Sequence, residues 1–164
     1  MGFYKGTDKK MKENELEQKQ MVINWAPYSM MDLASEKGEA ERVIQTVLGV
    51  DSSDPKYFGI LKSMGSKILY GKLTTLTDEM WSKLENTDSW KNVQSGDLKK
   101  AEEISRFYKK NFPGILEGIK NGSKIPVPII FKVGDKTHLM SGNNRLMIAR
   151  GLKQRPMVII VEYP

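Results

Sequence analysis

The sequence predicts an α+β protein with a small mixed β-sheet. Helical patterns of apolar side chains lie mainly between residues 26 and 111, whereas apolar runs typical of strands lie after residue 122. Helices that cluster in one part of a chain and strands that cluster in another are typical of the α+β class. No internal repeat or low-complexity linker divides the 164 residues, so we expect residues 21–164 to form a single domain.

The first twenty residues are interpreted as a tail. They are rich in Lys, Glu and Gln and contain almost no large apolar side chains, so we expect residues 1–20 to be disordered or, at most, a frayed helix. Their charge along the whole stretch also excludes a secretory signal. A first short strand is expected at residues 20–25, ended by Ala26-Pro27-Tyr28.

Five helices are expected from the spacing of apolar side chains and from start and stop signals. Their expected extents are residues 39–48, 54–65, 77–84, 98–108 and 113–121. The second begins at Asp54-Pro55, which combines a capping side chain with a proline in the first turn. Gly65 is a position where that helix can be interrupted, because glycine is a poor helix former.

After Gly122 the pattern changes to strand, turn, strand, loop, helix and strand. Apolar runs at residues 125–131 and 157–161 predict the outer strands, and residues 133–136 predict a turn. A short helix is expected from residue 146 to residue 151. The strands among these elements are expected to form the small mixed sheet.

Composition excludes several kinds of site. The chain has no cysteine and one histidine, His138, so disulfides, thiolate metal sites, thiol chemistry and sites with several histidines are excluded. No apolar run reaches the roughly 18 residues of a membrane span. We therefore expect a cytoplasmic protein with no membrane partner. The small size and lysine content are also typical of a phage or mobile-element protein.

The basic residues are concentrated in the last third of the chain. The formal net charge is +6, and residues 99–164 carry thirteen basic and five acidic side chains, whereas residues 21–98 carry eight and eleven. A positive field of this kind favours an anionic partner such as a nucleotide or DNA. The alternative is a solvated, lysine-rich helix face.

The strongest functional candidate is the loop at residues 140–145, Met-Ser-Gly-Asn-Asn-Arg. It lies between a predicted strand and a predicted helix, where backbone N–H groups and the helix dipole attract a phosphate, and Arg145 adds a fork of donors. The alternatives are a simple turn glycine at Gly142 and a surface ion pair at Arg145.

The C-terminal block resembles the ParB/sulfiredoxin superfamily over about residues 112–162. The resemblance rests on four runs, at residues 114–122, 128–131, 138–149 and 156–160, which correspond to a helix, a strand, a Gly-x-x-Arg loop that opens a helix, and a closing strand. It implies a nucleotide-binding domain of the type at the N-terminus of ParB, with residues 26–111 as a mainly helical part or insertion.

The resemblance also implies roles for the loop residues. Gly142, Asn143, Asn144 and Arg145 would bind the phosphates of ATP or CTP, with Mg²⁺ as the metal. Phosphoryl transfer or hydrolysis, by a kinase, a nucleoside triphosphatase or a nuclease, would then use Arg145 and Ser141 as catalytic residues.

Two further kinds of group are candidates for acid–base or metal-binding roles. His138 lies four residues before the glycine and can act as an acid or base, or it can be a packing residue at the end of the strand. Phosphoryl transfer also needs a carboxylate, and the sequence does not choose among the candidates Glu36, Glu39, Glu41 and Glu117.

Departures from the family pattern keep a second function open. Asn143 stands where sulfiredoxins have their cysteine, which excludes sulfinic acid chemistry, and Ser141 stands where several kinase-like and phage-borne relatives have aspartate. The alternative is therefore a non-catalytic DNA- or protein-binding module that retains the fold and a basic surface.

Overall fold

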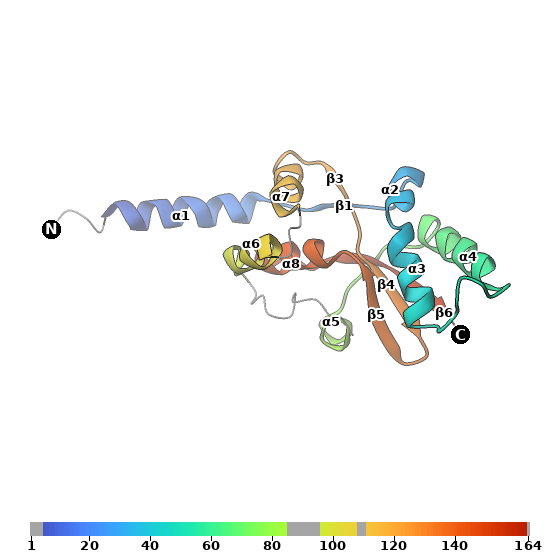
Figure 1. Cartoon of the computed structure of the whole chain (residues 1–164). Coiled ribbons are helices and arrows are strands. Elements are labelled where there is room, and N and C mark those ends of the chain that lie inside the picture. The colour runs from blue at the N-terminus through green and yellow to red at the C-terminus, as the bar shows by residue number, and fades with distance from the viewer. Residues whose placement is uncertain (1–4, 85–95, 108–110, 164) are drawn as a thin grey trace.

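A computed structural model describes residues 5–84, 96–107 and 111–163 (Figure 1). The elements in chain order are α1 (Lys5–Gln20), β1 (Asn24–Ala26), α2 (Met30–Ser35), α3 (Lys37–Thr46), α4 (Tyr57–Leu69), β2 (Thr74–Thr75), α5 (Asp78–Lys83), α6 (Leu98–Phe107), α7 (Phe112–Lys120), β3 (Lys124–Pro126), β4 (Ile129–Val133), β5 (Lys136–Ser141), α8 (Asn143–Gly151) and β6 (Met157–Tyr163). Within these ranges, no helix is long and apolar enough to cross a lipid bilayer.

The strands form a four-stranded mixed sheet and a separate two-stranded one. The order in the larger sheet is β2-β6-β4-β5. β4 runs parallel to β6 and antiparallel to β5, and β2 runs antiparallel to β6. The smaller sheet pairs β1 with β3 in parallel. The predicted α+β class and small mixed sheet are confirmed.

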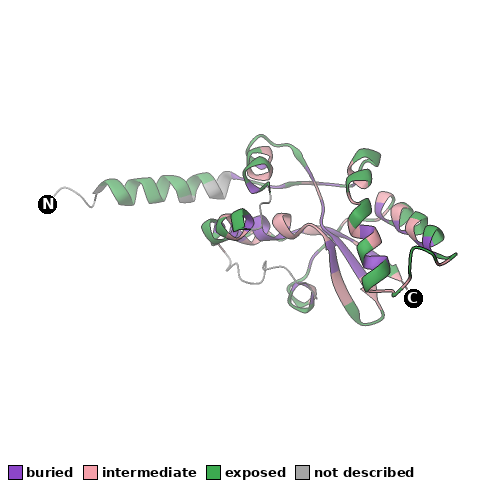
Figure 2. Ribbon diagram, in the orientation of Figure 1, coloured by how far each residue is buried: buried purple, intermediate pink, exposed green. Residues whose placement is uncertain are grey.

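Helices cover both faces of the larger sheet, so the fold has three layers. Alternate residues of a strand point to opposite faces. Ile129 and Phe131 of β4 accordingly pack with α3 and α4, whereas Ile130, between them, packs with α5, α6, α7 and α8. Figure 2 shows the buried strands between the helices. The start of α8 contacts both helical layers, because Arg145 contacts Glu36 between α2 and α3 and Asn144 contacts Ser105 of α6.

The five predicted helices are present, with bounds shifted by a few residues, as α3 to α7. α4 continues through Gly65 to Leu69 because its apolar face, which includes Met64 and Ile68, is buried. Two residues of the predicted pattern around α6, Ser95 and Tyr108, lie outside the described residues.

α2 was not expected from the sequence. It begins at Ser29, whose hydroxyl accepts a hydrogen bond from the Asp32 backbone N–H, while the Asp32 carboxylate accepts one from the Ser29 backbone N–H. This reciprocal capping box is a recognised helix start. The helix has only six residues and no fully buried side chain, so apolar periodicity gave no signal for it.

The structure has a helix, α1, where we expected a disordered tail or, at most, a frayed helix. Its Lys, Glu and Gln residues are good helix formers, and sixteen residues in a row are long enough for a helix to propagate. Lys120 of α7 lies 3.6 Å from Glu17 across an ion pair of exposed side chains. α1 otherwise projects from the layers (Figure 1).

The apolar run at residues 125–131, predicted as one strand, is split into β3 and β4. β3 pairs with β1 and β4 pairs with β6, so the chain changes sheets at Val127 and Pro128. Proline has no N–H group for a strand ladder, and Pro126 and Pro128 flank this change.

Candidate functional site

Gly142 occupies a position that only glycine fits. It is the N-terminal cap of α8, and its φ of +110° lies in the left-handed region. A Cβ atom at this position would lie 2.7 Å from Pro128 Cβ and 2.8 Å from Pro128 Cα. The Gly142 backbone is therefore packed directly against Pro128, the residue before β4. This close packing explains the glycine, whether or not a ligand also approaches it.

The predicted loop at residues 140–145 is reduced to Gly142, because β5 extends to Ser141 and α8 begins at Asn143. Asn143 and Asn144 therefore lie in the first turn of α8, and they have different surroundings. Asn144 Oδ1 accepts a hydrogen bond of 3.1 Å from the hydroxyl of Ser105, which is fully buried on α6. Among the described residues, the buried Asn143 Oδ1 has no hydrogen-bond partner. The first backbone N–H groups of a helix also lack acceptors within the helix. The Asn143 Oδ1 acceptor and the backbone N–H donors at the start of α8 therefore remain without partners in the described part of the chain, whereas Asn144 links α8 to α6.

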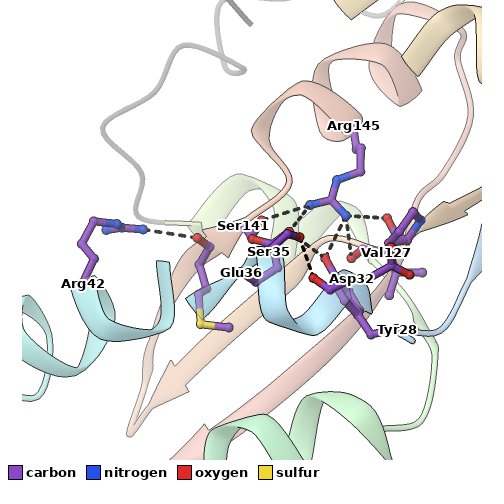
Figure 3. Close-up of polar contacts among 10 residues, drawn as sticks. Tyr28, Asp32, Ser35, Glu36, Arg42, Val127, Ser141 and Arg145 are labelled. Atoms are coloured by element: carbon purple, nitrogen blue, oxygen red, sulfur yellow. Dashed lines mark hydrogen bonds and ion pairs between the residues drawn. The ribbon is translucent and has the colours of Figure 1, made fainter. Parts of the chain in front are cut away.

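Arg145 is the centre of a group of polar side chains that we term the Arg145 cluster: Tyr28, Glu36, Ser141 and Arg145 (Figure 3). Its Nη1 donates to the Tyr28 hydroxyl at 2.8 Å. Its Nη2 donates to Glu36 Oε1 at 3.3 Å and to the Ser141 hydroxyl at 3.0 Å. The cluster thus joins α8, the end of β5, the α2–α3 junction and the segment after β1.

The guanidinium also holds the backbone where the chain changes sheets. Nη1 donates to the carbonyl oxygens of Pro126, at 2.6 Å, and Val127, at 3.2 Å. Only 13% of the Arg145 side chain is exposed. Its two terminal nitrogens are engaged with oxygen atoms of the chain, so Arg145 fixes the position of the loop. A phosphate would have to replace one of these oxygens to contact it directly.

The structure brings one of the four candidate carboxylates to the loop. Glu36 lies between α2 and α3, and 15% of its side chain is exposed. Glu39 instead pairs with Arg42 at 2.8 Å, and Glu41 pairs with Lys37 at 3.9 Å. Glu117 is exposed on α7. Sequence spacing did not distinguish Glu36 from its neighbours because its position depends on how α2 and α3 pack against the sheet.

Tyr28 was missed by the sequence reasoning, which treated it only as the end of a strand. Its hydroxyl lies 3.4 Å from Glu36 Oε1 and is buried with the rest of the ring. Burial raises the pKa of Tyr28 to about 12, although the nearby Arg145 charge acts in the opposite direction. The hydroxyl is therefore protonated at neutral pH, and no sequence motif could have identified it.

His138 lies within β5, before the loop. It pairs with Phe131 of β4 in the strand register and is half-buried. Ser141, by contrast, is the last residue of β5 and contacts Arg145 directly. Of the two candidates on this strand, the structure assigns Ser141 to the Arg145 cluster.

A groove of about 260 Å³ between α2, α3 and α4 has Glu36 in its wall. Its other lining residues are mostly apolar: Met30, Leu33, Ala34, Lys37, Ala40, Leu61, Gly65 and Ile68. The groove gives the carboxylate of the cluster a neighbouring space that can take part of a small molecule.

The cluster supplies at most one carboxylate to a metal ion. Within the described parts of the chain, no three His, Asp or Glu side chains group together as metal ligands. Mg²⁺ usually binds through one or two carboxylates together with substrate phosphates. Glu36 is the one carboxylate of the cluster that could serve as such a ligand, and it would have to give up its ion pair with Arg145 to do so. Comparison with family models, with curated proteins and with solved structures finds no match to this chain.

Proposed function

We propose that the chain is a nucleotide-binding protein of the ParB/sulfiredoxin type, which transfers or hydrolyses the phosphoryl groups of ATP or CTP. The observation that carries this proposal is the Arg145 cluster. A carboxylate, a hydroxyl and a guanidinium from distant parts of the chain meet beside a helix start that is opened by a left-handed glycine. Phosphoryl transfer requires charge neutralisation, a base and oriented donors.

The phosphates would bind the start of α8. Backbone N–H groups of Asn143 and Asn144 and the amide of Asn143 would donate to the phosphate oxygens, and the helix dipole adds favourable electrostatics. Because Arg145 is held by Tyr28 and by carbonyl oxygens, it would act mainly through its charge and by holding the loop in place.

The cluster offers one carboxylate for two roles, and we assign Glu36 the role of general base, which leaves Mg²⁺ to be held by the substrate phosphates. An acceptor hydroxyl or water would lose its proton to the Glu36 carboxylate as its oxygen attacks the terminal phosphorus, and the bond to the nucleoside diphosphate would break. Mg²⁺, when bound, would neutralise charge on the phosphates. Ser141 would orient the guanidinium or the acceptor oxygen through its hydroxyl. The acceptor or the base of the nucleotide would occupy the groove beside Glu36.

The test compares two glutamates one helical turn apart. We expect ATP or CTP with Mg²⁺ to raise the melting temperature of the wild type and to be turned over. Glu36→Gln keeps the size of the side chain and should lower turnover by about 10²–10⁴, which is the range for loss of a general base. The matched control is Glu39→Gln, which removes a charge that pairs with Arg42 and should leave turnover unchanged.

A second variant separates binding from chemistry. Asn143→Asp places a negative charge in the first turn of α8, where the charge interacts favourably with the helix dipole but repels phosphate. It should abolish nucleotide-induced stabilisation. Because Asn143 Oδ1 is buried and has no partner among the described residues, the new charge should also lower the stability of the free protein. The readout is therefore the rise in melting temperature that nucleotide adds, compared between variant and wild type. Asn111→Asp, which retains a capping oxygen at the start of α7, is the control. If no nucleotide stabilises the wild type and neither ATP nor CTP is turned over, the proposal fails.

The alternative is a non-catalytic DNA- or protein-binding module. It is favoured by the contacts of Arg145, whose terminal nitrogens are engaged within the chain as they would be in a purely structural residue. In that case DNA binding would depend steeply on salt and would not respond to nucleotide.

A further inference from the structure

A second cleft lies at the opposite end of α8 from Gly142. Its volume is about 280 Å³, and it is lined by Asp78, Trp81, Arg150, Lys153, Gln154 and Arg155. We term it the basic cleft, because three of its six side chains are cationic and one is acidic. Pockets for small organic ligands are mostly apolar, and this lining is mostly charged or polar.

Lys153 is held in a conformation that side chains usually avoid. The backbone N–H of Gln154 donates to Ala149 O and that of Lys153 donates to Arg150 O, which together form the Schellman ending of a helix. The residue at this point adopts a left-handed conformation and is usually glycine. Here it is a lysine with φ of +57°, the one non-glycine residue with positive φ in the described chain.

Gly96 provides the space for the stem of that lysine. Its φ is +87°, and a Cβ atom at this position would lie 2.5 Å from Lys153 Cε. The Gly96 backbone N–H donates to Arg150 O. A glycine at one position and a strained backbone at another thus place a lysine side chain along the wall of the basic cleft.

The rest of the cleft is also fixed in place. The Arg150 guanidinium lies over the Trp81 ring, with its Cζ atom 5.4 Å from the ring centre. Gln154 Oε1 accepts from the Ile23 backbone N–H at 2.9 Å, and Gln154 Nε2 donates to Met21 O. The side chains of Arg150 and Gln154 are therefore held in place by the protein itself.

Arg155 can exchange its partner for a ligand oxygen. It contacts Asp78 at 3.0 Å, but the two side chains are 49% and 82% exposed. Exposed ion pairs contribute little free energy because water screens them. A phosphate that displaces Asp78 would therefore meet little resistance.

We propose that the basic cleft binds the phosphate backbone of a nucleic-acid strand. Arg150 and Lys153 would contact phosphate oxygens within it, and Arg155 would contact them at its rim. An open, charged cleft suits a polyanion that runs across it better than an enclosed small molecule. The cleft contains no residue of the Arg145 cluster, so this proposal stands or falls separately from the proposed nucleotide site.

The test uses Lys153→Gly, which should separate binding from stability. Glycine relieves the left-handed strain, so the melting temperature should stay the same or rise. Binding of a fluorescein-labelled oligothymidylate should weaken about tenfold, which corresponds to one charge-assisted hydrogen bond. The slope of log affinity against log salt should fall by about 0.7 for each phosphate group that the variant no longer binds.

Two more variants control for net charge. Lys62→Ala removes the same charge from an exposed position of α4, in the other helical layer, and should leave affinity and salt slope nearly unchanged. Asp78→Asn removes the competing carboxylate and should tighten binding several-fold, an increase that loss of structure would not cause. Equal weakening by Lys62→Ala and Lys153→Gly would overturn the proposal, because only overall charge would then matter.

A competition experiment distinguishes a nucleic-acid strand from a mononucleotide or inorganic phosphate as the ligand of the basic cleft. ATP with Mg²⁺ and inorganic phosphate are added separately to the complex with the labelled oligonucleotide. Neither should displace it at concentrations comparable to that of the strand. If ATP binds as tightly as the strand and loses its binding in Lys153→Gly, the cleft is a mononucleotide site and the proposal is wrong.

Discussion

Replacing Gly142 with alanine tests the close packing of the loop against Pro128. The substitution adds one methyl group where the backbone φ is +110° and where that methyl would lie 2.7 Å from Pro128 Cβ and 2.8 Å from Pro128 Cα. The second of these atoms belongs to the backbone and cannot rotate away. Either the loop or the start of β4 must therefore shift.

Two costs reduce the free energy of unfolding. A left-handed conformation lowers the stability by about 1–2 kcal/mol when the residue has a Cβ. Overpacking in a close-packed region lowers it by about 1–3 kcal/mol. The expected loss for Gly142→Ala is thus about 2–5 kcal/mol, a large part of the roughly 5–15 kcal/mol that stabilises a typical domain. For a chain of this length, at about 2–4 °C for each kcal/mol, the melting temperature should fall by roughly 4–20 °C.

Urea and thermal denaturation measure the loss, and Gly122→Ala is the control. Gly122 also has positive φ, +71°, but a Cβ there would meet nothing within 4 Å. The Gly122→Ala variant should therefore lose only the stability that the left-handed conformation costs, about 1–2 kcal/mol. Equal losses in the two variants would refute the reasoning, because the packing against Pro128 would then contribute nothing.

Three further predictions concern other parts of the fold. The pKa of Tyr28 is raised to about 12, so the folded state keeps a proton that the unfolded state loses above pH 10, and the free energy of unfolding should fall by about 2–3 kcal/mol between pH 10 and 12. Urea denaturation across this range should show a shallower fall for Tyr28→Phe than for the wild type. Equal slopes of unfolding free energy against pH would argue against a raised pKa. Gly65→Ala in α4 should stabilise by about 0.5–1 kcal/mol, as should Gly59→Ala, since neither added Cβ would approach another atom closely; a loss at Gly65 alone, in urea denaturation, would mean that α2 packs closer than described. Ser105→Ala should lower stability by about 1–3 kcal/mol because it removes the hydrogen-bond donor to Asn144, and an unchanged unfolding midpoint would show that water replaces the hydroxyl.

The sequence predicted elements whose cause is local. α5 follows the start signal at Thr77, whose hydroxyl accepts the expected capping hydrogen bond from the Met80 N–H. α4 was predicted to begin at Asp54-Pro55, but it begins at Tyr57, and its N-cap Lys56 makes no side-chain capping bond. The turn before Lys136 was also predicted, and a glycine of positive φ marks it. A helix was predicted at residues 146–151, and α8 begins three residues earlier, directly after Gly142. In these cases a few neighbouring residues determine the conformation.

Features that depend on distant contacts were not predicted. β2 has only two residues, Thr74 and Thr75, and is defined by its pairing with β6. Glu36 and Tyr28 belong to the candidate site only because Arg145, more than a hundred residues later in the chain, contacts both. Local patterns contain no information about such partners, so the sequence identified Ser141 and Arg145, left Glu36 as one of four candidate carboxylates and missed Tyr28.

The pairing of β1 with β3 has a consequence for how the chain folds as it leaves the ribosome. Asn24 pairs with Lys124, and Met21 and Ile23 are held by Gln154. Helices α2 to α4 emerge before β4, β5 and β6, the strands that cover their apolar side chains. The nascent chain must therefore keep an uncovered apolar surface until those strands have been synthesised, and such a surface is open to chaperones and to mispairing.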